Sequence, residues 1–316
     1  MDIAFFEWES VCGSDLSPKA LEAFGKVRYM DPPKPEEVIS LIGDSQVVLC
    51  SKVKITGEMM DACPNLRYIG LTATGYNNID VVAAGERGIT VTNIPSYSSD
   101  AVAQLTVTFL LQFATSFMAY ASSTARGDWT RSKLFCYYPY PMTELTGKTL
   151  GLLGLGSIGE KVAKLGQALG MRVIYHSRTK KDLPYEYVSQ EELFSQSDFL
   201  SLHCPLTPET QGIVGEENLA RMKKSAFLIN TARGGLVDEE ALARALNQER
   251  IAGFAADVLT VEPQRQDCPL MGAKNCILTP HVAWAPKETR ARLFGILVEN
   301  LRRYLAGDAQ NVVNPR

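Results

Sequence analysis

A glycine-rich stretch near the middle of the chain constrains the fold more than any other feature. The apolar run Thr149–Leu153 predicts a strand buried in a parallel sheet, and it leads directly into Gly154-Leu155-Gly156-Ser157-Ile158-Gly159. Residues 160–169 then carry the apolar spacing of a helix. In this context the glycines permit a tight turn, close approach of the backbone to a pyrophosphate, and close packing of helix on strand. The stretch predicts a dinucleotide site, and a glycine-rich turn without a ligand is the alternative.

The end of the next predicted strand, 172–177, indicates which dinucleotide binds. A site for NAD usually has an acidic residue here, which accepts a hydrogen bond from the ribose 2′-hydroxyl. This chain instead has Ser177 and Arg178, followed by Thr179 and two lysines. A hydroxyl and a guanidinium suit a 2′-phosphate. We therefore expect NADP(H) to be favoured over NAD(H), with a solvated basic turn as the alternative.

Length and composition exclude several classes of protein. A chain of 316 residues predicts two domains of ordinary size. The net charge of −3 and a pI near 5.8 argue against a nucleic-acid-binding surface. No apolar run has the length of a membrane span, and the N-terminus lacks the positive region of a signal peptide. Seven scattered cysteines predict reduced, mostly buried thiols in a cytoplasmic protein. Three histidines without clustered ligands make a metal site unexpected.

The first hundred residues alternate between strand and helix patterns, which predicts an α/β unit with a parallel sheet. We expect strands at 3–6, 47–50, 68–71 and 89–92, and helices at 17–24, 35–43, 57–63 and 80–86. Some of these strands end in segments that could face a ligand, namely Ser51-Lys52, Thr72-Ala73-Thr74-Gly75 and Asn93-Ile94-Pro95. A hydroxyl, a cation and bare backbone N–H groups all suit an anion, although ordinary turns would have the same composition.

The segment after Ser98 is expected to bury most of its surface. Residues 98–121 predict one long helix that is apolar around most of its circumference, as in a subunit interface or a hinge between domains. Residues 126–142 are aromatic and irregular, and we expect them to pack on a partner subunit or to cover a cleft.

The second half of the chain repeats the alternation of strand and helix. Strands are expected at 149–153, 172–177, 199–203, 226–230, 251–258 and 276–279. Six such strands around the glycine loop describe a doubly wound nucleotide-binding domain. The predicted fold class is therefore α/β, with two doubly wound parallel-sheet domains.

Three residues with the chemistry of a redox active site follow predicted strands of this half. Arg233 lies in a glycine-rich turn, Glu262 precedes Pro263, and His281 follows the last strand. Arginine binds a carboxylate in a bidentate fork and polarises a neighbouring carbonyl group. Histidine exchanges protons near neutral pH, and a carboxylate on its other ring nitrogen would fix the tautomer. His176 and His203 are expected to be structural or to lie beside the cofactor.

Six motifs together resemble the D-isomer-specific 2-hydroxyacid dehydrogenase family, and the resemblance covers essentially the whole chain. They are Thr74-Gly75-Tyr76-Asn77-Asn78-Ile79-Asp80, Gly154-Leu155-Gly156-Ser157-Ile158-Gly159, Leu202-His203-Cys204-Pro205-Leu206-Thr207, Asn230-Thr231-Ala232-Arg233-Gly234-Gly235-Leu236-Val237-Asp238, Asp257-Val258-Leu259-Thr260-Val261-Glu262-Pro263 and Pro280-His281-Val282-Ala283-Trp284-Ala285. The missing acidic residue at Ser177 departs from the commoner family pattern.

The resemblance implies roles for particular residues. The catalytic set would be Arg233, Glu262 and His281. The cofactor would be bound by Gly154, Gly156, Ser157, Ile158, Ser177, Arg178, Cys204, Pro205, Thr210, Thr231, Ala232 and Asp257, the last three at its nicotinamide end. The substrate would be bound by Ser51, Lys52, Thr74, Gly75, Arg233 and His281.

The resemblance also implies the domain organisation and the partners. Residues 1–98 and 286–316 would form a flavodoxin-like substrate-binding domain, and residues 99–285 a Rossmann-type cofactor domain. The helix after Ser98 would form the interface of a homodimer. The last residues look like the ending of the family, without an appended regulatory domain.

The histidine motif is similar to that of bacterial glycerate dehydrogenases, also called hydroxypyruvate reductases. It implies hydroxypyruvate and D-glycerate as the substrate pair. Glyoxylate or D-lactate is the alternative within the same enzyme class. A nucleotide-sensing, corepressor-like interaction protein is the alternative from another class.

Overall fold

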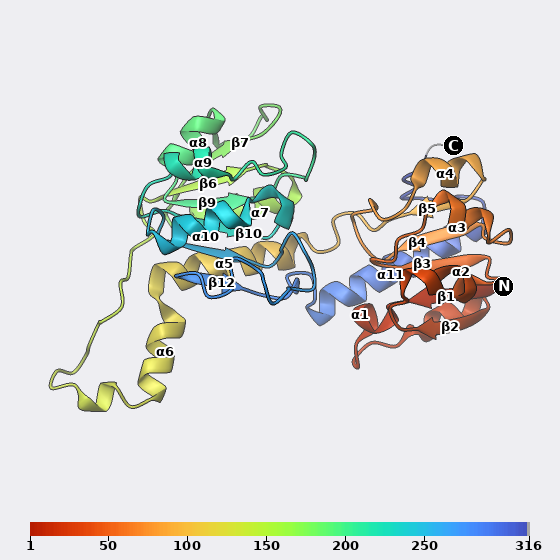
Figure 1. The fold of residues 1–316 in the computed structure, drawn as a ribbon, viewed down its shortest axis with the longest axis horizontal. Helices are drawn as coiled ribbons and strands as arrows, with labels where there is room; N and C mark the ends of the chain where they lie inside the picture. Colours follow the sequence, from red (N-terminus) through yellow and green to blue (C-terminus); the bar gives the residue numbers. More distant parts are fainter. Residues whose placement is uncertain (315–316) are drawn as a thin grey trace. The chain divides into compact units, whose positions relative to one another are not determined.

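A computed structural model of the protein describes residues 1–314, so the last two positions of the predicted segment 286–316 lie outside the described residues. The chain forms two compact units (Figure 1). Unit 1 comprises Met1–Ser98 and the chain from Trp284 onward, and unit 2 comprises Ser99–Ala283. Each unit contains one parallel β-sheet with helices on its faces. The predicted fold class is confirmed.

The sheet of unit 1 has the strand order β2-β1-β3-β4-β5, which is the flavodoxin-like order. Its strands are β1 (Asp2–Phe6), β2 (Lys26–Met30), β3 (Val47–Cys50), β4 (Tyr68–Leu71) and β5 (Thr90–Thr92). Its helices are α1 (Trp8–Cys12), η1 (Pro18–Phe24), η2 (Pro35–Glu37), α2 (Val38–Ile42), α3 (Gly57–Asp61), α4 (Val81–Glu86) and α11 (Lys287–Leu305). Alternate residues of each strand face opposite sides, so Ile3 and Phe5 pack beneath α11 while Ala4 and Phe6 face the other layer.

Two elements of unit 1 are absent from the sequence prediction. The strand β2 lies at the edge of the sheet, and its residues are exposed or half-buried. An edge strand with cations at alternate positions carries little of the apolar signal that reveals β3 and β4. The helix α1 is only five residues long, which is too short for a periodic pattern.

The sheet of unit 2 has the order β12-β11-β10-β9-β6-β7-β8, a complete doubly wound arrangement. Its strands are β6 (Thr149–Leu153), β7 (Arg172–His176), β8 (Glu186–Tyr187), β9 (Phe199–Leu202), β10 (Phe227–Asn230), β11 (Gly253–Ala256) and β12 (Cys276–Leu278). Its helices are α5 (Ser99–Thr115), α6 (Phe117–Ala125), η3 (Trp129–Arg131), α7 (Ser157–Ala168), α8 (Gln190–Gln196), α9 (Glu216–Arg221), η4 (Gly234–Leu236) and α10 (Glu239–Asn247). All six predicted strands are present, and the short β8 extends the edge beside β7.

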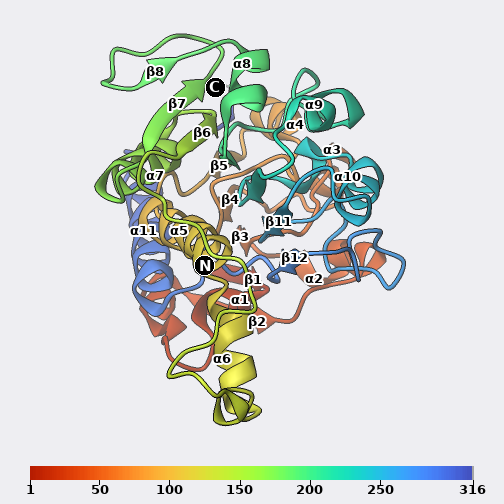
Figure 2. The ribbon, with the colours of Figure 1, turned by 90° about the vertical axis from the view of Figure 1, so that its left-hand side faces the viewer.

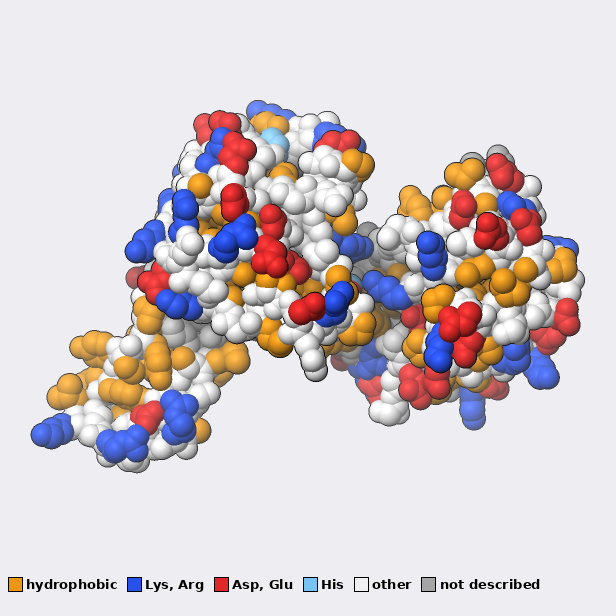
Figure 3. Space-filling view, in the orientation of Figure 1, with side chains coloured by type: hydrophobic (Ala, Val, Ile, Leu, Met, Phe, Trp, Pro, Cys, Tyr) orange, Lys and Arg blue, Asp and Glu red, His pale blue; other side chains and the backbone are white. Residues whose placement is uncertain are grey.

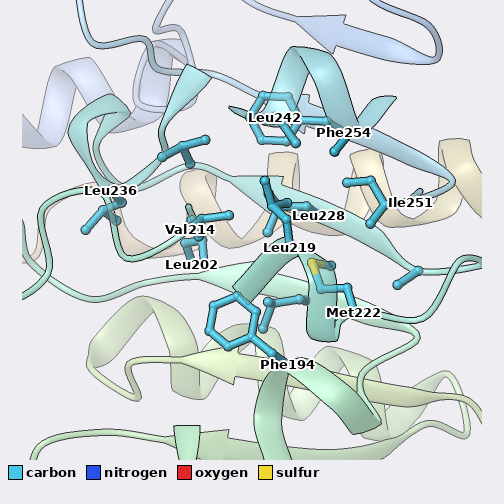
Figure 4. Close-up of a cluster of buried hydrophobic side chains, with 14 of the residues drawn as sticks. Phe194, Leu202, Val214, Leu219, Met222, Leu228, Leu236, Leu242, Ile251 and Phe254 are labelled. Atoms are coloured by element: carbon cyan, nitrogen blue, oxygen red, sulfur yellow. The ribbon is translucent and has the colours of Figure 1, made fainter. Parts of the chain in front are cut away.

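Two apolar layers cover the faces of this sheet. On one face α5 and α7 lie side by side, with α7 over β6 and α5 over β10 (Figures 1 and 2). On the other face Phe194 of α8, Leu219 of α9 and Leu242 of α10 meet Leu228 of β10 (Figure 4). Because both faces are covered, the polar groups that can meet a ligand are confined to the ends of the strands.

The prediction of one helix over 98–121 is wrong. The chain bends by 64° between α5 and α6, where Ser116 has a left-handed backbone with φ 50°. The returning chain stabilises the break, because Thr143 N donates to Ala114 O at 2.8 Å and Ser116 Oγ donates to Pro141 O. The predicted burial is confirmed for α5, which has many buried residues, whereas Ser123 is the one buried residue of α6.

The segment 117–142, which we call the arm, projects from unit 2 (Figure 1). Hydrophobic side chains gather along it (Figure 3). No single described helix is long and apolar enough to cross a membrane, although the bent pair α5–α6 passes that test by length and composition.

The cysteines are free thiols, as predicted, but fewer are buried than expected. Cys12, Cys50 and Cys63 are buried, and the other four are half-buried. Within residues 1–314, no group of three His, Cys, Asp or Glu side chains is placed to hold a metal ion.

Candidate active site

The glycine loop between β6 and α7 has the geometry of a dinucleotide cradle. Gly154 has φ +94°, and a Cβ there would lie 2.6 Å from Cys204 N. A Cβ on Gly159 would lie 2.6 Å from Gly154 O, so the third glycine lets the helix approach the strand. At Gly156, by contrast, a Cβ would meet nothing within 4 Å, which leaves the backbone open at the start of α7. Tight turn, open approach and close packing are the three roles that a pyrophosphate site requires.

The turn after β7 places its polar groups beside this loop. Ser177 Oγ donates to Thr179 O at 2.7 Å, within the turn itself. The Lys181 ammonium donates to Leu155 O and lies 3.6 Å from Glu160 Oε1. Lys181 therefore ties the predicted 2′-phosphate turn to the glycine loop, a contact that spacing along the sequence does not reveal.

The loop after β9 carries Cys204, Pro205 and Thr210. Thr210 Oγ1 donates to Pro205 O and accepts from Thr207 N, both at 2.8 Å, so this hydroxyl braces the loop. His203 precedes the loop, and its Nε2 lies 2.9 Å from Ser201 Oγ. Burial lowers the pKa of His203 from 6.5 to about 4, which keeps the imidazole neutral at neutral pH. That His203 is structural or lies beside the cofactor stays a prediction.

The lowered pKa of His203 predicts acid sensitivity of the fold. The unfolded chain binds a proton below about pH 6.5 that the folded ring does not bind until about pH 4. The free energy of unfolding should therefore fall as the pH falls through this range. At about 1.4 kcal/mol per pKa unit, His203 lowers the free energy of unfolding at pH 4.5 by at most about 3 kcal/mol. Urea unfolding at pH 7 and pH 4.5 should show a smaller fall for His203→Gln than for the unchanged protein. Equal falls would contradict the prediction.

The turn after β10 presents Arg233. Asn230 organises the turn, because its Nδ2 donates to Arg233 O at 2.8 Å and its Oδ1 accepts from Ala232 N at 3.0 Å. The buried hydroxyl of Thr231 lies 2.8 Å from Thr106 Oγ1 of α5. Arg233 is itself exposed, and its Nη1 donates to Ala232 O at 2.7 Å. The turn thus fixes the backbone of Arg233 and leaves most of the guanidinium donors for a ligand.

Glu262 and His281 form the carboxylate–histidine pair that the sequence predicts. His281 Nδ1 lies 2.7 Å from Glu262 Oε2, and both side chains are about one-third exposed, at 29% and 32%. The other carboxylate oxygen, Glu262 Oε1, accepts from Leu259 N at 3.0 Å. A carboxylate held in this way directs the second ring nitrogen, Nε2, away from the pair. The arrangement supports proton exchange at Nε2.

Asp257 has a structural task that the sequence does not reveal. Its carboxylate is 1% exposed and accepts from Thr279 Oγ1 at 2.6 Å, Val282 N at 2.9 Å and Ala283 N at 2.7 Å. These donors flank His281, whose backbone has φ 55°. Asp257 therefore builds the turn that carries His281. The predicted contact of Asp257 with the nicotinamide stays a prediction.

The predicted substrate residues of unit 1 follow β3 and β4, which are adjacent parallel strands. Thr74 Oγ1 donates to Ile94 O, and Asn93 Nδ2 donates to Thr74 O, both at 2.7 Å. These bonds hold the segment that contains Gly75 against the one that follows β5. The backbone N–H groups of Ser51 and Lys52 are already bonded to the carboxylate of Glu7, a residue that lies in none of the six motifs.

Comparison with known proteins identifies the family. The family model described as "D-isomer specific 2-hydroxyacid dehydrogenase, NAD binding domain" matches residues 107–283. The hydroxypyruvate reductase of Blautia hydrogenotrophica is 44% identical over 307 residues, which covers 95% of either chain. The chain belongs to the D-isomer-specific 2-hydroxyacid dehydrogenase family. It is an oxidoreductase that acts on a CH–OH group with NAD or NADP, and the resemblance drawn from the six motifs is confirmed.

Two further members support the same family. The glycerate dehydrogenase of Methylorubrum extorquens is 41% identical and covers 88% of each chain. The NADPH-dependent glyoxylate/hydroxypyruvate reductase of Sinorhizobium meliloti, solved with NADP and malonate, has a TM-score of 0.83 at 30% identity. That alignment covers 99% of this chain and 96% of the other.

Proposed function

We propose that this dehydrogenase interconverts hydroxypyruvate and D-glycerate and prefers NADPH. The 2.7 Å bond between His281 and Glu262 carries the chemical part of the proposal, because it joins a proton-exchanging ring to a charge-stabilising carboxylate. The choice of substrate rests on the Pro-His-Val-Ala-Trp-Ala motif and on the names of the relatives.

The protein residues have separable tasks in this reaction. A nicotinamide cofactor, when bound, would supply the hydride that reduces C2 of the 2-oxo acid. Arg233 binds the substrate carboxylate in a bidentate fork and polarises the ketone. His281 donates the proton on Nε2 to the oxygen at C2, and Glu262 stabilises the imidazolium before that transfer. In the oxidation of D-glycerate, His281 takes the proton back.

The residues around the glycine loop fit the cofactor. Gly154, Gly156, Ser157 and Ile158 would hold the pyrophosphate at the start of α7. Ser177 and Arg178 would hold the 2′-phosphate. Cys204, Pro205 and Thr210 would line the adjacent loop, and Thr231, Ala232 and Asp257 the nicotinamide end.

The proposed function is tested by initial rates of NADPH and NADH oxidation with hydroxypyruvate, glyoxylate and pyruvate. We expect fast turnover of hydroxypyruvate with NADPH. Faster turnover of glyoxylate or pyruvate would move the assignment to an alternative within the enzyme class. Cofactor binding without turnover of any of the three acids would favour the nucleotide-sensing alternative.

Arg178→Ala should raise the KM for NADPH about tenfold to a hundredfold, which is the range expected for loss of a hydrogen bond between charged groups. The KM for NADH should stay within about twofold, because NADH lacks the 2′-phosphate. Steady-state kinetics with each cofactor measure both values. Lys164→Ala, which removes an exposed cation from α7, is the charge control. If the KM values for the two cofactors changed equally, or not at all, the turn would be a solvated loop that does not bind the 2′-phosphate.

We also propose that the protein is a homodimer through α5 and the arm. Large apolar side chains of the arm are exposed, with Phe135 at 90% and Phe117 at 68%. Leu111 of α5 and Trp129, Leu134, Tyr138 and Met142 of the arm are exposed as well. An apolar surface of this kind is typical of a protein interface, and a second copy of the chain is the partner implied by the family.

Phe117→Asp should shift the protein from dimer to monomer, because a charge would be buried without a partner at the interface. Analytical ultracentrifugation of the two proteins at micromolar concentration measures the change. Val82→Asp places the same charge on an exposed apolar residue of α4 in unit 1, and it should leave the mass unchanged. A monomeric unchanged protein would refute the dimer directly.

A further inference from the structure

Glu7 adopts a backbone conformation that is unusual for its residue type. It follows β1 directly and has φ 58° and ψ 26°, the left-handed region that glycine adopts readily and other residues rarely. Hydrogen bonds on both sides hold it there: Glu7 N donates to Met30 O at 2.9 Å, and Glu7 O accepts from Ser10 N at 3.0 Å. A strained residue that its surroundings maintain is a candidate for a functional position.

The conformation directs the Glu7 carboxylate to the loop after β3. Oε2 accepts from two consecutive backbone N–H groups, those of Ser51 and Lys52, both at 2.8 Å. Asn78 Nδ2 donates to Val53 O of the same loop at 2.8 Å. Glu7 and Asn78 therefore both hold the loop.

This contact changes what the loop can offer a substrate. Two adjacent backbone N–H groups form a natural anion site, and here that site is filled by the protein's own carboxylate. At Ser51 and Lys52, only the side chains are then left for a substrate carboxylate. The second oxygen of Glu7, Oε1, accepts no hydrogen bond from any other residue in 1–314 and can accept one from a ligand.

Glu7 lies where a substrate is expected. The strand β1 is paired in parallel with β3, and β3 with β4, so Glu7, Ser51-Lys52 and Thr74-Gly75 follow the carboxyl ends of adjacent strands. Ligands of doubly wound sheets bind outside this edge. Glu7 thus adds a negative charge and a vacant acceptor to a loop that we assign to substrate binding.

We propose that Glu7 determines substrate specificity by selecting the group on C3 of the 2-oxo acid. This inference rests on the proposed function. A neutral hydroxyl on C3, as in hydroxypyruvate, can donate to Glu7 Oε1. A carboxylate on C3, as in oxaloacetate, would be repelled by Glu7, so the residue discriminates against dianionic acids as well as favouring hydroxylated ones. Glu7 Oε2 meanwhile positions the Ser51-Lys52 loop.

The variant Glu7→Gln separates charge from positioning. Its amide oxygen can still accept from both backbone N–H groups, so the loop is retained while the negative charge is lost. Steady-state kinetics with hydroxypyruvate, pyruvate and oxaloacetate give kcat/KM for each acid. We expect the oxaloacetate to hydroxypyruvate ratio to rise at least tenfold in Glu7→Gln. Glu7→Ala, which also releases the loop, should in addition raise the KM for all three acids.

Glu9→Gln is the matched control, because Glu9 is an exposed carboxylate two residues further along the chain. It should leave the ratio unchanged. A ratio that Glu7→Gln leaves unchanged, or equal losses for all three acids, would overturn the specificity role and assign Glu7 a purely structural one. If the unchanged protein turned over none of the acids, the proposed function itself would fail, and that outcome is distinct from an unaltered ratio in an active enzyme.

Discussion

Arg233→Ala should lower kcat/KM for the 2-oxo acid about a thousandfold, the largest loss that we expect from a single side chain. The guanidinium is the cation of the turn after β10, and Asn230 fixes the backbone of this turn. Removing a charged donor that stabilises developing negative charge costs about 10²–10³ in rate, and the lost carboxylate fork adds to this. Steady-state kinetics with hydroxypyruvate measure the change.

Two variants sharpen the Arg233 experiment. Arg233→Lys keeps the positive charge but loses the bidentate geometry, and it should recover only a small part of the activity. Arg250→Ala removes an exposed arginine that precedes β11, at the opposite, amino end of the same sheet, and should retain activity. Intact activity in Arg233→Ala would refute the catalytic assignment.

Gly234→Ala should lower kcat/KM at least about a hundredfold through a purely steric effect. A Cβ at this position would lie 1.9 Å from Leu259 C and 2.2 Å from Thr260 N. Both contacts are backbone atoms, so one of the two loops must shift. One loop carries Arg233 and the other carries Glu262, and a displacement of about 1 Å at a reacting group costs about a hundredfold in rate.

Further hydrogen bonds make the Leu259–Thr260 peptide hard to displace. Leu259 N donates to Glu262 Oε1 at 3.0 Å, and Thr260 N donates to Glu239 Oε1 at 2.7 Å. A shift would therefore break the support of the carboxylate that pairs with His281. We also expect a stability loss of about 1–3 kcal/mol, as for other overpacked sites, measurable by urea unfolding.

Gly235→Ala is the adjacent control for Gly234→Ala. The nearest atom to a Cβ at Gly235 is Leu206 Cδ2 at 3.0 Å, the far end of a flexible side chain. The leucine can rotate away, so activity should stay within about threefold of the unchanged enzyme. Similar losses in the two variants would show that the turn needs glycine for a reason other than the contact with Leu259.

The strands and the glycine loop could be predicted because their signals are local. An apolar run such as β6 has few alternatives to a buried strand. The three glycines indicate the tight turn, the accessible backbone at the start of α7 and the close contact of helix and strand. The break at Ser116 could not be predicted. It depends on bonds to residues 141 and 143, and the sequence from 98 to 121 continues the helical pattern through it.

The candidate site also combines features that local sequence signals predict with contacts that only the folded structure shows. The sequence alone was enough to nominate Arg233, Glu262 and His281, because strand ends, glycine turns and residue chemistry are written along the chain. Only the tertiary structure decided which contacts support the predicted site residues. Asp257 accepts from the turn that carries His281, Gly234 packs against Leu259, and Glu7 accepts from the Ser51-Lys52 loop. Asp257 and Val282 are 25 residues apart in the sequence, Gly234 and Leu259 are also 25 apart, and Glu7 and Ser51 are 44 apart. Both Asp257 and Glu7 bind backbone N–H groups, which every residue except proline possesses. Since almost any residue can supply a backbone N–H group, the sequence does not show which of these groups a carboxylate binds, and only the folded structure shows it.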